Sequence, residues 1–171
     1  TLLAGGSFTN ISGKPSTYLA AFDSNSLLIE NWGPVYSGTI YSILVDSNYI
    51  FIGGSYGQMN GAFYRGLTKL NRNGQASNWC PQINNAVYTI YNGETQLHVG
   101  GSFNMVNMVT RGSLASIDLV SGKPTNWHPN TNGTVRDIQI NDSTIYVGGA
   151  FSLYPDKPEI QLLHSTNKPG N

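Results

Sequence analysis

The sequence carries little charge. Only 11% of its 171 residues are charged, nine basic and nine acidic, against about 25% in an average soluble domain. The two signs cancel, so the chain has no field that would attract nucleic acid or an anionic membrane. Solubility must come from neutral polar groups, and the chain is rich in Asn, Ser, Thr, Gly and Tyr. This surface is more typical of secreted or cell-surface proteins than of cytosolic enzymes.

Cysteine and long apolar runs are also scarce. The one cysteine, Cys80, excludes an internal disulfide and a cysteine-based metal cage. We expect it to be a small buried residue, with an intermolecular bridge or a reactive thiol as alternatives. No apolar run approaches the ~20 residues that span a bilayer, so no membrane insertion is predicted. No segment keeps a 3.6-residue period over ten or more residues, which argues against helices.

Four features recur at one period. The glycine pairs are Gly5-Gly6, Gly53-Gly54, Gly100-Gly101 and Gly148-Gly149, spaced by 48, 47 and 48 residues. Each pair is followed by a small residue and then an aromatic one. Trp32, Trp79 and Trp127 keep the same step, each within a W-x-P triplet, and so do Leu19, Leu67, Leu114 and Leu162. Four features at one spacing indicate an internal repeat.

Each repeat predicts four short strands. The run before the glycines alternates with period two, as in Ile145, Tyr146 and Val147, and similar runs precede and follow it. A short fourth strand would carry the Trp and end at the proline, which cannot donate to a ladder. Clusters of Gly, Asn, Asp and Ser separate the runs. The pattern predicts an all-β chain of β-propeller blades, about three and a half four-stranded antiparallel repeats of 47–48 residues.

The repeated glycines and tryptophans have structural explanations. A glycine pair at a strand end lets the backbone bend or be approached closely by the neighbouring blade. The tryptophans are expected to fill the core between blades, with ligand stacking as the alternative.

The units "YVGGAF", "LAAFD" and "NWHPNTNGTV" closely resemble the delta-60 repeats, a β-propeller family of large secreted and surface proteins of bacteria and other organisms. Similar units occur in fungal cell-surface polarity proteins. The resemblance covers residues 2 to about 151 and implies a propeller fold in an extracellular setting. It implies no activity and no catalytic residues. The last unit departs from the family pattern, because Ser165 and Thr166 stand where the third strand should end in an apolar residue and Asp.

The repeat marks predict a single domain over residues 1–171 that begins and ends within a blade, with residues 155–171 as a degenerate terminal half-blade. A closed propeller typically needs at least four blades, so open sheet edges are expected, and such edges template further pairing. Three arrangements follow: a piece of a longer propeller, two copies closing a seven-bladed ring, or copies joined into a filament.

No catalytic or metal site is predicted, and no cofactor. His98, His128 and His164 occupy different repeat positions. Asp23, Asn71 and Asp118 share one position and are expected to cap turns, with calcium ligation as the alternative. Asp137, with Ser42 and Thr89 at its position, could face a central channel and bind a small ligand.

Three sequons, at Asn10, Asn132 and Asn141, lie in predicted loops and are candidate glycosylation sites of a glycoprotein. Ten tyrosines could supply platforms for sugar or protein on the loop faces.

We therefore expect a non-catalytic extracellular repeat module with a structural or adhesive role. Its partners would be proteins: other copies, or the rest of a longer surface protein or filament. A glycan-binding, lectin-like propeller is the alternative, and an enzyme with a channel-mouth site is a minor one.

Overall fold

The computed structural model describes residues 1–141, 144–152 and, for the backbone alone, 160–163. Over these residues the chain is all-β, with antiparallel pairing throughout except at its last strand, and without a helix. The prediction of an all-β chain built from antiparallel sheets is confirmed at this level.

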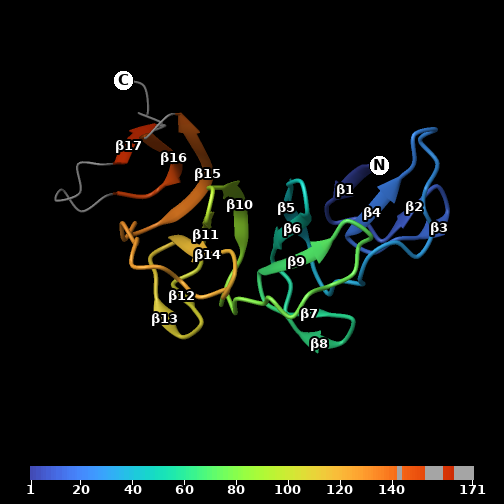
Figure 1. The fold of residues 1–171 in the computed structure, drawn as a ribbon, viewed down its shortest axis with the longest axis horizontal. Coiled ribbons are helices and arrows are strands. Elements are labelled where there is room, and N and C mark those ends of the chain that lie inside the picture. Colours follow the sequence, from blue (N-terminus) through green and yellow to red (C-terminus); the bar gives the residue numbers. More distant parts are fainter. Residues whose placement is uncertain (142–143, 153–159, 164–171) are drawn as a thin grey trace, which may run out of the picture.

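Four sheets follow one another along the chain (Figure 1). The first sheet pairs β1 (Leu2–Gly5) with β4 (Leu19–Phe22). The second is β5 (Ile40–Val45), β6 (Tyr49–Gly54) and β9 (Leu67–Asn71); the third is β10 (Val87–Asn92), β11 (Gln96–Gly101) and β14 (Leu114–Asp118); the fourth is β15 (Thr134–Asn141), β16 (Thr144–Ala150) and β17 (Ile160–Leu163). Strands β5, β10 and β15 are called leading strands here, because each is the first of its sheet. Among the described residues the first sheet has no leading strand.

A small hairpin interrupts each of the first three sheets before its last strand. These hairpins are β2 (Asn10–Ile11) with β3 (Lys14–Pro15), β7 (Gln58–Met59) with β8 (Ala62–Phe63), and β12 (Met105–Val106) with β13 (Val109–Thr110). Their two-residue turns have positive φ at both positions, as at Asn60 (50°) and Gly61 (77°). That geometry matches the right-handed twist of a hairpin and favours Asn and Gly.

The predicted fourth strand of each repeat is not formed among the described residues. The segment ahead of each Trp makes one bridge to the last strand: Phe22 with Leu28, Leu70 with Ala76, and Ile117 with Pro124. The prediction of four-stranded repeats is wrong in this respect. Two residues after each Trp the chain reaches a proline, which has no N–H to extend a ladder, and the chain turns away to the next sheet.

The fourth sheet differs from the other three. Strand β17 runs parallel to β16, with Gly148 opposite Leu163, whereas β14 runs antiparallel to β11, with Gly100 opposite Leu114. The expectation of antiparallel strands therefore fails here. Of the predicted degenerate half-blade at 155–171, only residues 160–163 are among those described.

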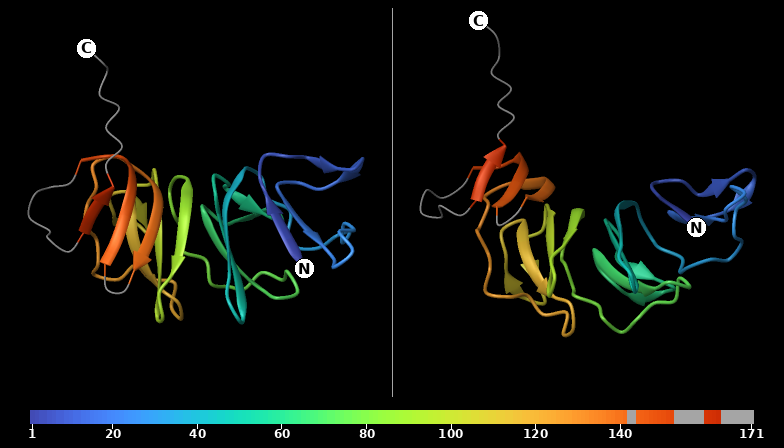
Figure 2. Two further views of the ribbon diagram at one scale, coloured as in Figure 1. Left: turned by 90° about the horizontal axis from the view of Figure 1, so that it is seen from above. Right: turned by 45° about the horizontal axis from the view of Figure 1, so that its top comes forward.

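The sheets succeed one another in an open arc, with the first and fourth at opposite ends (Figure 2). The described residues do not close a ring. Each leading strand lies beside a strand of the neighbouring sheet: β5 contacts β1 and β10, and β10 contacts β15. Three apolar clusters fill the spaces between successive sheets. The core is therefore distributed over three junctions.

Each leading strand contains a β-bulge at one position. The register with the glycine-pair strand shifts between Ile40 and Ser42, between Val87 and Thr89, and between Val135 and Asp137. The extra residues are Tyr41, Tyr88 and Arg136. A bulge bends the strand and re-aims its side chains.

Candidate functional site

The first glycine of each pair lies against the leading strand of the next sheet. The facing residues are Gly5 with Ile40, Gly53 with Val87, and Gly100 with Val135. A Cβ added to Gly53 would lie 2.9 Å from Cγ1 of Val87, and one added to Gly5 would lie 2.5 Å from Cγ2 of Ile40. Neither distance leaves room for a side chain. The glycine is a socket for the β-branched side chain of the next sheet.

The second glycine of each pair meets a backbone carbonyl within its own sheet. The carbonyl belongs to the residue before the bulge region of the leading strand: Thr39 over Gly54, Ala86 over Gly101, and Thr134 over Gly149. A Cβ at any of these glycines would overlap the oxygen. Each leading strand thus contacts two glycines: the second glycine of the pair in its own sheet and the first glycine of the pair in the preceding sheet.

The pattern has two exceptions, one at each end of the arc. A Cβ on Gly148 would meet only Cβ of Asp137, at 4.0 Å, because no described sheet follows the fourth. A Cβ on Gly6 would meet only the ring of Phe8, at 3.3 Å, because the first sheet has no leading strand. The two ends of the described chain therefore present glycine surfaces that are covered at every other junction.

The tryptophans lie between successive sheets. Trp79 is 8% exposed, packs edge-to-face on Phe51 with ring centroids 5.6 Å apart, and donates from Nε1 to the carbonyl of Asp118 in the third sheet (3.2 Å). Trp127 packs in the same way on the His98 ring, at 5.1 Å. Trp32 packs against the cluster between the first and second sheets. These contacts give the tryptophans a role in joining sheets.

The segment between one sheet and the next is here called the linker, and the first two linkers dock on the hairpin of the following sheet. Linkers comprise residues 34–39, 81–86 and 129–133. Tyr36 forms a bridge with Met59, and Ile83 forms the equivalent bridge with Val106. The turn residue Asn60 accepts a hydrogen bond from the Val35 N–H at 2.8 Å through its side chain. Sequence reasoning missed this contact, although the W-x-P spacing and the recurring Asn or Ser of the hairpin turn were visible signals.

A buried polar cluster sits beneath the first of these linkers. The hydroxyl of Thr68 lies 2.9 Å from that of Tyr36 and 3.1 Å from that of Tyr56, and the Tyr56 hydroxyl donates to the Ile52 carbonyl at 2.8 Å. Burial raises the pKa of both tyrosines well above the ordinary value. Both hydroxyls therefore stay protonated, which makes the cluster a structural hydrogen-bond network.

The histidines do not converge. His98 is 5% exposed and lies with Nδ1 2.6 Å from the Ser116 hydroxyl, and burial lowers its pKa. His128 is half-buried, with Nδ1 2.7 Å from the Asn126 carbonyl. His164 lies outside the described residues. Within the part of the chain that is described, no three His, Cys, Asp or Glu side chains gather as metal ligands do.

The Asp23, Asn71 and Asp118 side chains cap turns. In each, Oδ1 accepts backbone N–H groups two to four residues ahead, as when Asp118 accepts from Val120 at 3.2 Å and Ser121 at 2.6 Å. Hydrogen bonds from Ser121 lower the pKa of Asp118. Oδ1 of each side chain is thus hydrogen-bonded within its own turn.

The residues of the predicted channel position differ in burial. Thr89 is buried, while Asp137 is exposed and accepts a hydrogen bond from the Ile138 N–H at 2.9 Å. The bulge residues, in contrast, form a row: the rings of Tyr41 and Tyr88 lie 5.0 Å apart, and the Arg136 guanidinium carbon lies 5.9 Å from the Tyr88 ring. The sequence predicted tyrosine platforms on the loop faces but not this alignment.

The three sequon asparagines are exposed. Asn132 lies in a linker, whereas Asn10 is in β2 and Asn141 is the last residue of β15, so only one is in a loop. Residues 142 and 143, the rest of the third sequon, lie outside the described residues. The Asn132 Oδ1 accepts a hydrogen bond from the Ser152 N–H at 2.5 Å, which leaves its amide nitrogen for glycosylation.

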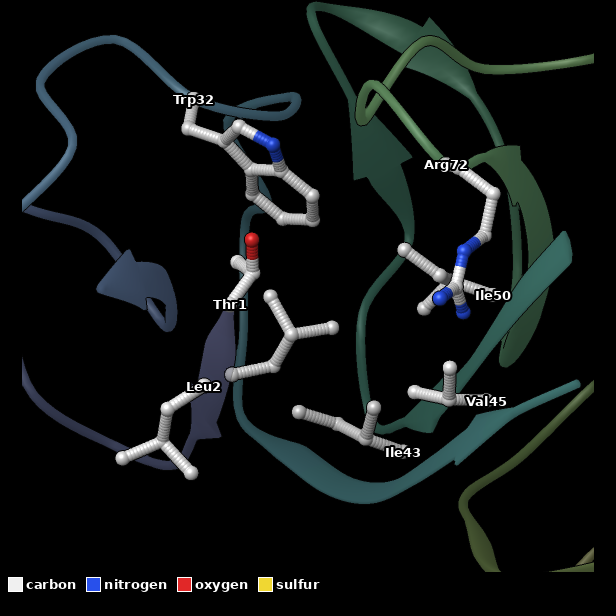
Figure 3. A pocket seen from close by; sticks show the side chains of 8 residues that line it. Thr1, Leu2, Trp32, Ile43, Val45, Ile50 and Arg72 are labelled. Carbon is white, nitrogen blue, oxygen red and sulfur yellow. The ribbon is translucent and has the colours of Figure 1, made fainter. Parts of the chain in front are cut away.

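A cavity of about 460 Å³ lies between the first and second sheets (Figure 3). Its lining is mainly apolar: Leu2, Leu3, Trp32, Ile43, Val45 and Ile50, with Thr1 and Arg72. Trp32 and Arg72 stand on opposite sides of the space, and the Arg72 guanidinium donates to the carbonyl of Asp46 at 2.9 Å. Leu3 occupies the position that Phe51 fills at the next junction, which leaves this one less completely packed. Its polar side chains are the Thr1 hydroxyl, the Arg72 guanidinium and the Trp32 indole N–H.

Cys80 is half-buried, with its sulfur 2.9 Å from Nε2 of Gln82. Burial raises the pKa of its thiol, so the reactive thiolate form is disfavoured at neutral pH.

Comparison with known proteins finds no matching family model, no matching curated protein and no matching solved structure. The resemblance to delta-60 repeats therefore stays a prediction. No helix that could span a membrane occurs in the described parts of the chain. The arrangement that recurs through the described residues is the junction between sheets.

Proposed function

We propose that the chain is an arc of β-propeller blades with a structural or adhesive role outside the cell, carried out by association with other protein sheets and without catalysis. The observation that carries the proposal is the repeated junction, in which Gly5, Gly53 and Gly100 each receive an Ile or Val side chain from the leading strand of the following sheet.

The propeller architecture is supported by the order of contacts. Each sheet packs through its glycine-pair strand on the leading strand of the next, and the leading strands lie side by side. In a β-propeller, successive short sheets are arranged with their first strands close together. The extracellular setting is supported by the low charge and the three exposed sequon asparagines.

The native mass of the particle in solution, with electron microscopy of the same sample, tests the proposal. Discrete dimers, rings or long polymers would support association through the sheet ends. The proposal would be contradicted if the particle stayed monomeric at concentrations far above those at which protein complexes ordinarily form and if it bound no other repeat-bearing protein.

A glycan-binding role is the second candidate, favoured by the row of Tyr41, Tyr88 and Arg136. Tyr41 is 48% exposed, and tyrosines present an apolar ring with a polar edge that suits sugars. Binding of soluble oligosaccharides that is lost in Tyr41→Ala and Tyr88→Ala would favour this role. Equal oligosaccharide binding by both variants and the parent chain would exclude a glycan-binding role for this row.

A further inference from the structure

A cavity of about 590 Å³ lies between the second and third sheets, in the middle of the described chain. Its lining includes Asp46, Tyr49 and Lys69 from the second sheet, with Asn92, Glu94 and Leu119 from the third. Ligand pockets in proteins usually measure about 300–1,000 Å³. We propose that this cavity binds a neutral saccharide unit. The inference goes beyond the proposed function, because it requires no association between protein sheets.

Asn92 stands at a position that is aliphatic in the other leading strands. It lies opposite the residue three positions before the glycine pair, as Val45 does in β5 and Ile140 in β15. Ile140 packs against the apolar cluster between the third and fourth sheets. Oδ1 of Asn92, in contrast, is buried and has no hydrogen-bond partner among the described residues. A buried acceptor without a partner lowers stability, so packing alone does not explain an amide at this position.

A bound hydroxyl group would supply the missing partner. Asn92 is part of the lining of the cavity. Rotation about the last bond of its side chain exchanges Oδ1 and Nδ2. This rotation turns the acceptor toward a ligand in the cavity and needs no movement of the main chain.

Lys69 also stands at a position that is small and buried in the neighbouring sheets. It lies opposite the residue two positions before the glycine pair, as Ala21 and Ser116 do, and both of these are 0% exposed. Its Nζ lies 3.9 Å from the centroid of the Tyr49 ring and donates to the Leu119 carbonyl at 3.2 Å. Within the described part of the chain Lys69 forms no ion pair, and burial lowers its pKa. An ammonium has three N–H donors, so Lys69 has donors left for a ligand oxygen.

The charges around the cavity favour a neutral ligand. An anion would meet the carboxylates of Asp46 and Glu94, and a cation would meet the Lys69 ammonium. The lining offers both donors and acceptors, and a hydroxyl group serves as either. The ring of Tyr49, 38% exposed, adds an apolar surface with a polar edge. A saccharide unit matches this set, because it is neutral, carries several hydroxyl groups and has an apolar face.

The cavity is separate from the row of Tyr41, Tyr88 and Arg136. These three are the bulge residues near the start of each leading strand. Asn92 is the last residue of β10, and Asp46 follows the last residue of β5. The two candidate sugar sites therefore lie toward opposite ends of the leading strands, and substitutions distinguish them.

The test titrates the 171-residue chain with maltopentaose, cellopentaose, mannopentaose and N-acetylchitopentaose, followed by calorimetry and by NMR of the backbone amides. We expect saturable binding of at least one of them, one site per chain, with resonance shifts at residues 46–49, 92–94 and 119–120. Failure of all four to saturate at about 5 mM overturns the inference. Tighter binding of oligogalacturonate than of any neutral sugar overturns the choice of a neutral ligand.

Asn92→Val is the first variant, because it restores the aliphatic residue of the equivalent position in β5. We expect urea unfolding at the same or a higher midpoint, since an unpaired buried amide is removed. Binding of the oligosaccharide should be at least about tenfold weaker. Binding equal to that of the parent chain would reject the cavity as the site.

Lys69→Met is the second variant, because it keeps the apolar stem beside Tyr49 and removes the donors. It too should bind at least about tenfold more weakly. Lys14→Met is the matched control: Lys14 is an exposed lysine of the first hairpin, and its loss should leave binding unchanged. If binding is lost in Tyr41→Ala but kept in Asn92→Val and Lys69→Met, the sugar lies on the row and the inference is wrong.

This inference and the proposed function fail separately. A chain that stays monomeric and binds no other repeat-bearing protein, yet binds the oligosaccharide through Asn92 and Lys69, rejects association and keeps the cavity. A chain that assembles but binds none of the four oligosaccharides keeps the association and rejects the cavity.

Discussion

Gly100 faces Val135 across the junction between the third and fourth sheets so closely that a methyl group on the glycine would overlap the valine side chain. The same relationship joins the first three sheets. It means that the distance between neighbouring sheets is set by the absence of a side chain at one position and the presence of a β-branched one at another.

Replacing Gly100 tests this relationship. Gly100→Ala should lower the free energy of unfolding by about 1–3 kcal/mol, because the added methyl overfills a closed junction. Urea titration followed by tryptophan fluorescence measures the change. Gly148→Ala is the matched control, since its Cβ meets nothing closer than 4.0 Å, and it should stay within about 0.5 kcal/mol of the parent. Equal losses of unfolding free energy in the two variants would contradict the inference that Gly100 must lack a side chain to receive Val135.

The tryptophan between the second and third sheets should be a main contributor to stability. Trp79→Ala removes a buried ring packed on Phe51 and should cost about 3–5 kcal/mol. Circular dichroism during thermal unfolding reports the loss. Val120→Ala, at a side chain that is 91% exposed, serves as the reference and should leave the unfolding midpoint unchanged. A similarly small effect of Trp79→Ala would refute a joining role for this residue.

The buried hydroxyl of Tyr56 is a separate contributor. Tyr56→Phe leaves the Ile52 carbonyl and the Thr68 hydroxyl without their bonds to Tyr56, and the free energy of unfolding should fall by about 1–3 kcal/mol. Tyr41→Phe removes an exposed hydroxyl and should change little. Urea unfolding of the two variants side by side makes the comparison, and a neutral Tyr56→Phe would show that the network adds nothing to stability.

His98 should make stability depend on pH. Its pKa is lowered by burial, so at acidic pH the unfolded chain binds a proton that the folded chain does not. Stability from this group is therefore complete above the ordinary His pKa of about 6.5 and is lost as pH falls below it. Urea unfolding at several pH values between about 5 and 7.5 should show the decline.

The matched variants for that experiment are His98→Phe and His128→Asn. His98→Phe should flatten the pH dependence, whatever its effect on overall stability, because Phe51 occupies the equivalent position in the second sheet. His128→Asn replaces a half-buried histidine away from the His98 site and serves as the control. A slope that survives in His98→Phe would assign the dependence to another residue.

Glycosylation can be checked directly. Expression through a eukaryotic secretory pathway should add glycan at Asn10 and Asn132, seen as a mass decrease on enzymatic deglycosylation. Asn10→Gln and Asn132→Gln should each remove one glycan. An unmodified chain that has passed through that pathway would exclude these two sites.

The sequence predicted the strand content well because the signals were local. Alternation before each glycine pair located β6, β11 and β16, and the period of 47–48 residues aligned every sheet with the next. Local patterns could not distinguish the roles of the two glycines of a pair. The first glycine lies against the leading strand of the neighbouring sheet, whereas the second lies against the bulged leading strand of its own sheet.

The incorrect or missing predictions have similar physical causes. The Trp segment was predicted as a strand because it lies between turn signals. The proline after the Trp cannot donate to a ladder, and the indole packs into the junction between sheets. The segment therefore forms only one bridge to the last strand of its sheet. The docking of linkers on hairpins joins residues more than 20 positions apart, such as Tyr36 and Met59, and no local pattern reveals it. The parallel pairing of β17 likewise depends on a contact that periodicity does not encode.

The glycine junction also has a direction. One surface contributes a bare backbone and the other an Ile or Val side chain, so the two halves of the contact are unlike. A contact of this kind cannot lie on a two-fold axis, which would bring like surfaces together. Copies that join through it must do so head to tail, and the rotation at each joint decides whether they return to the starting copy or continue as a helix.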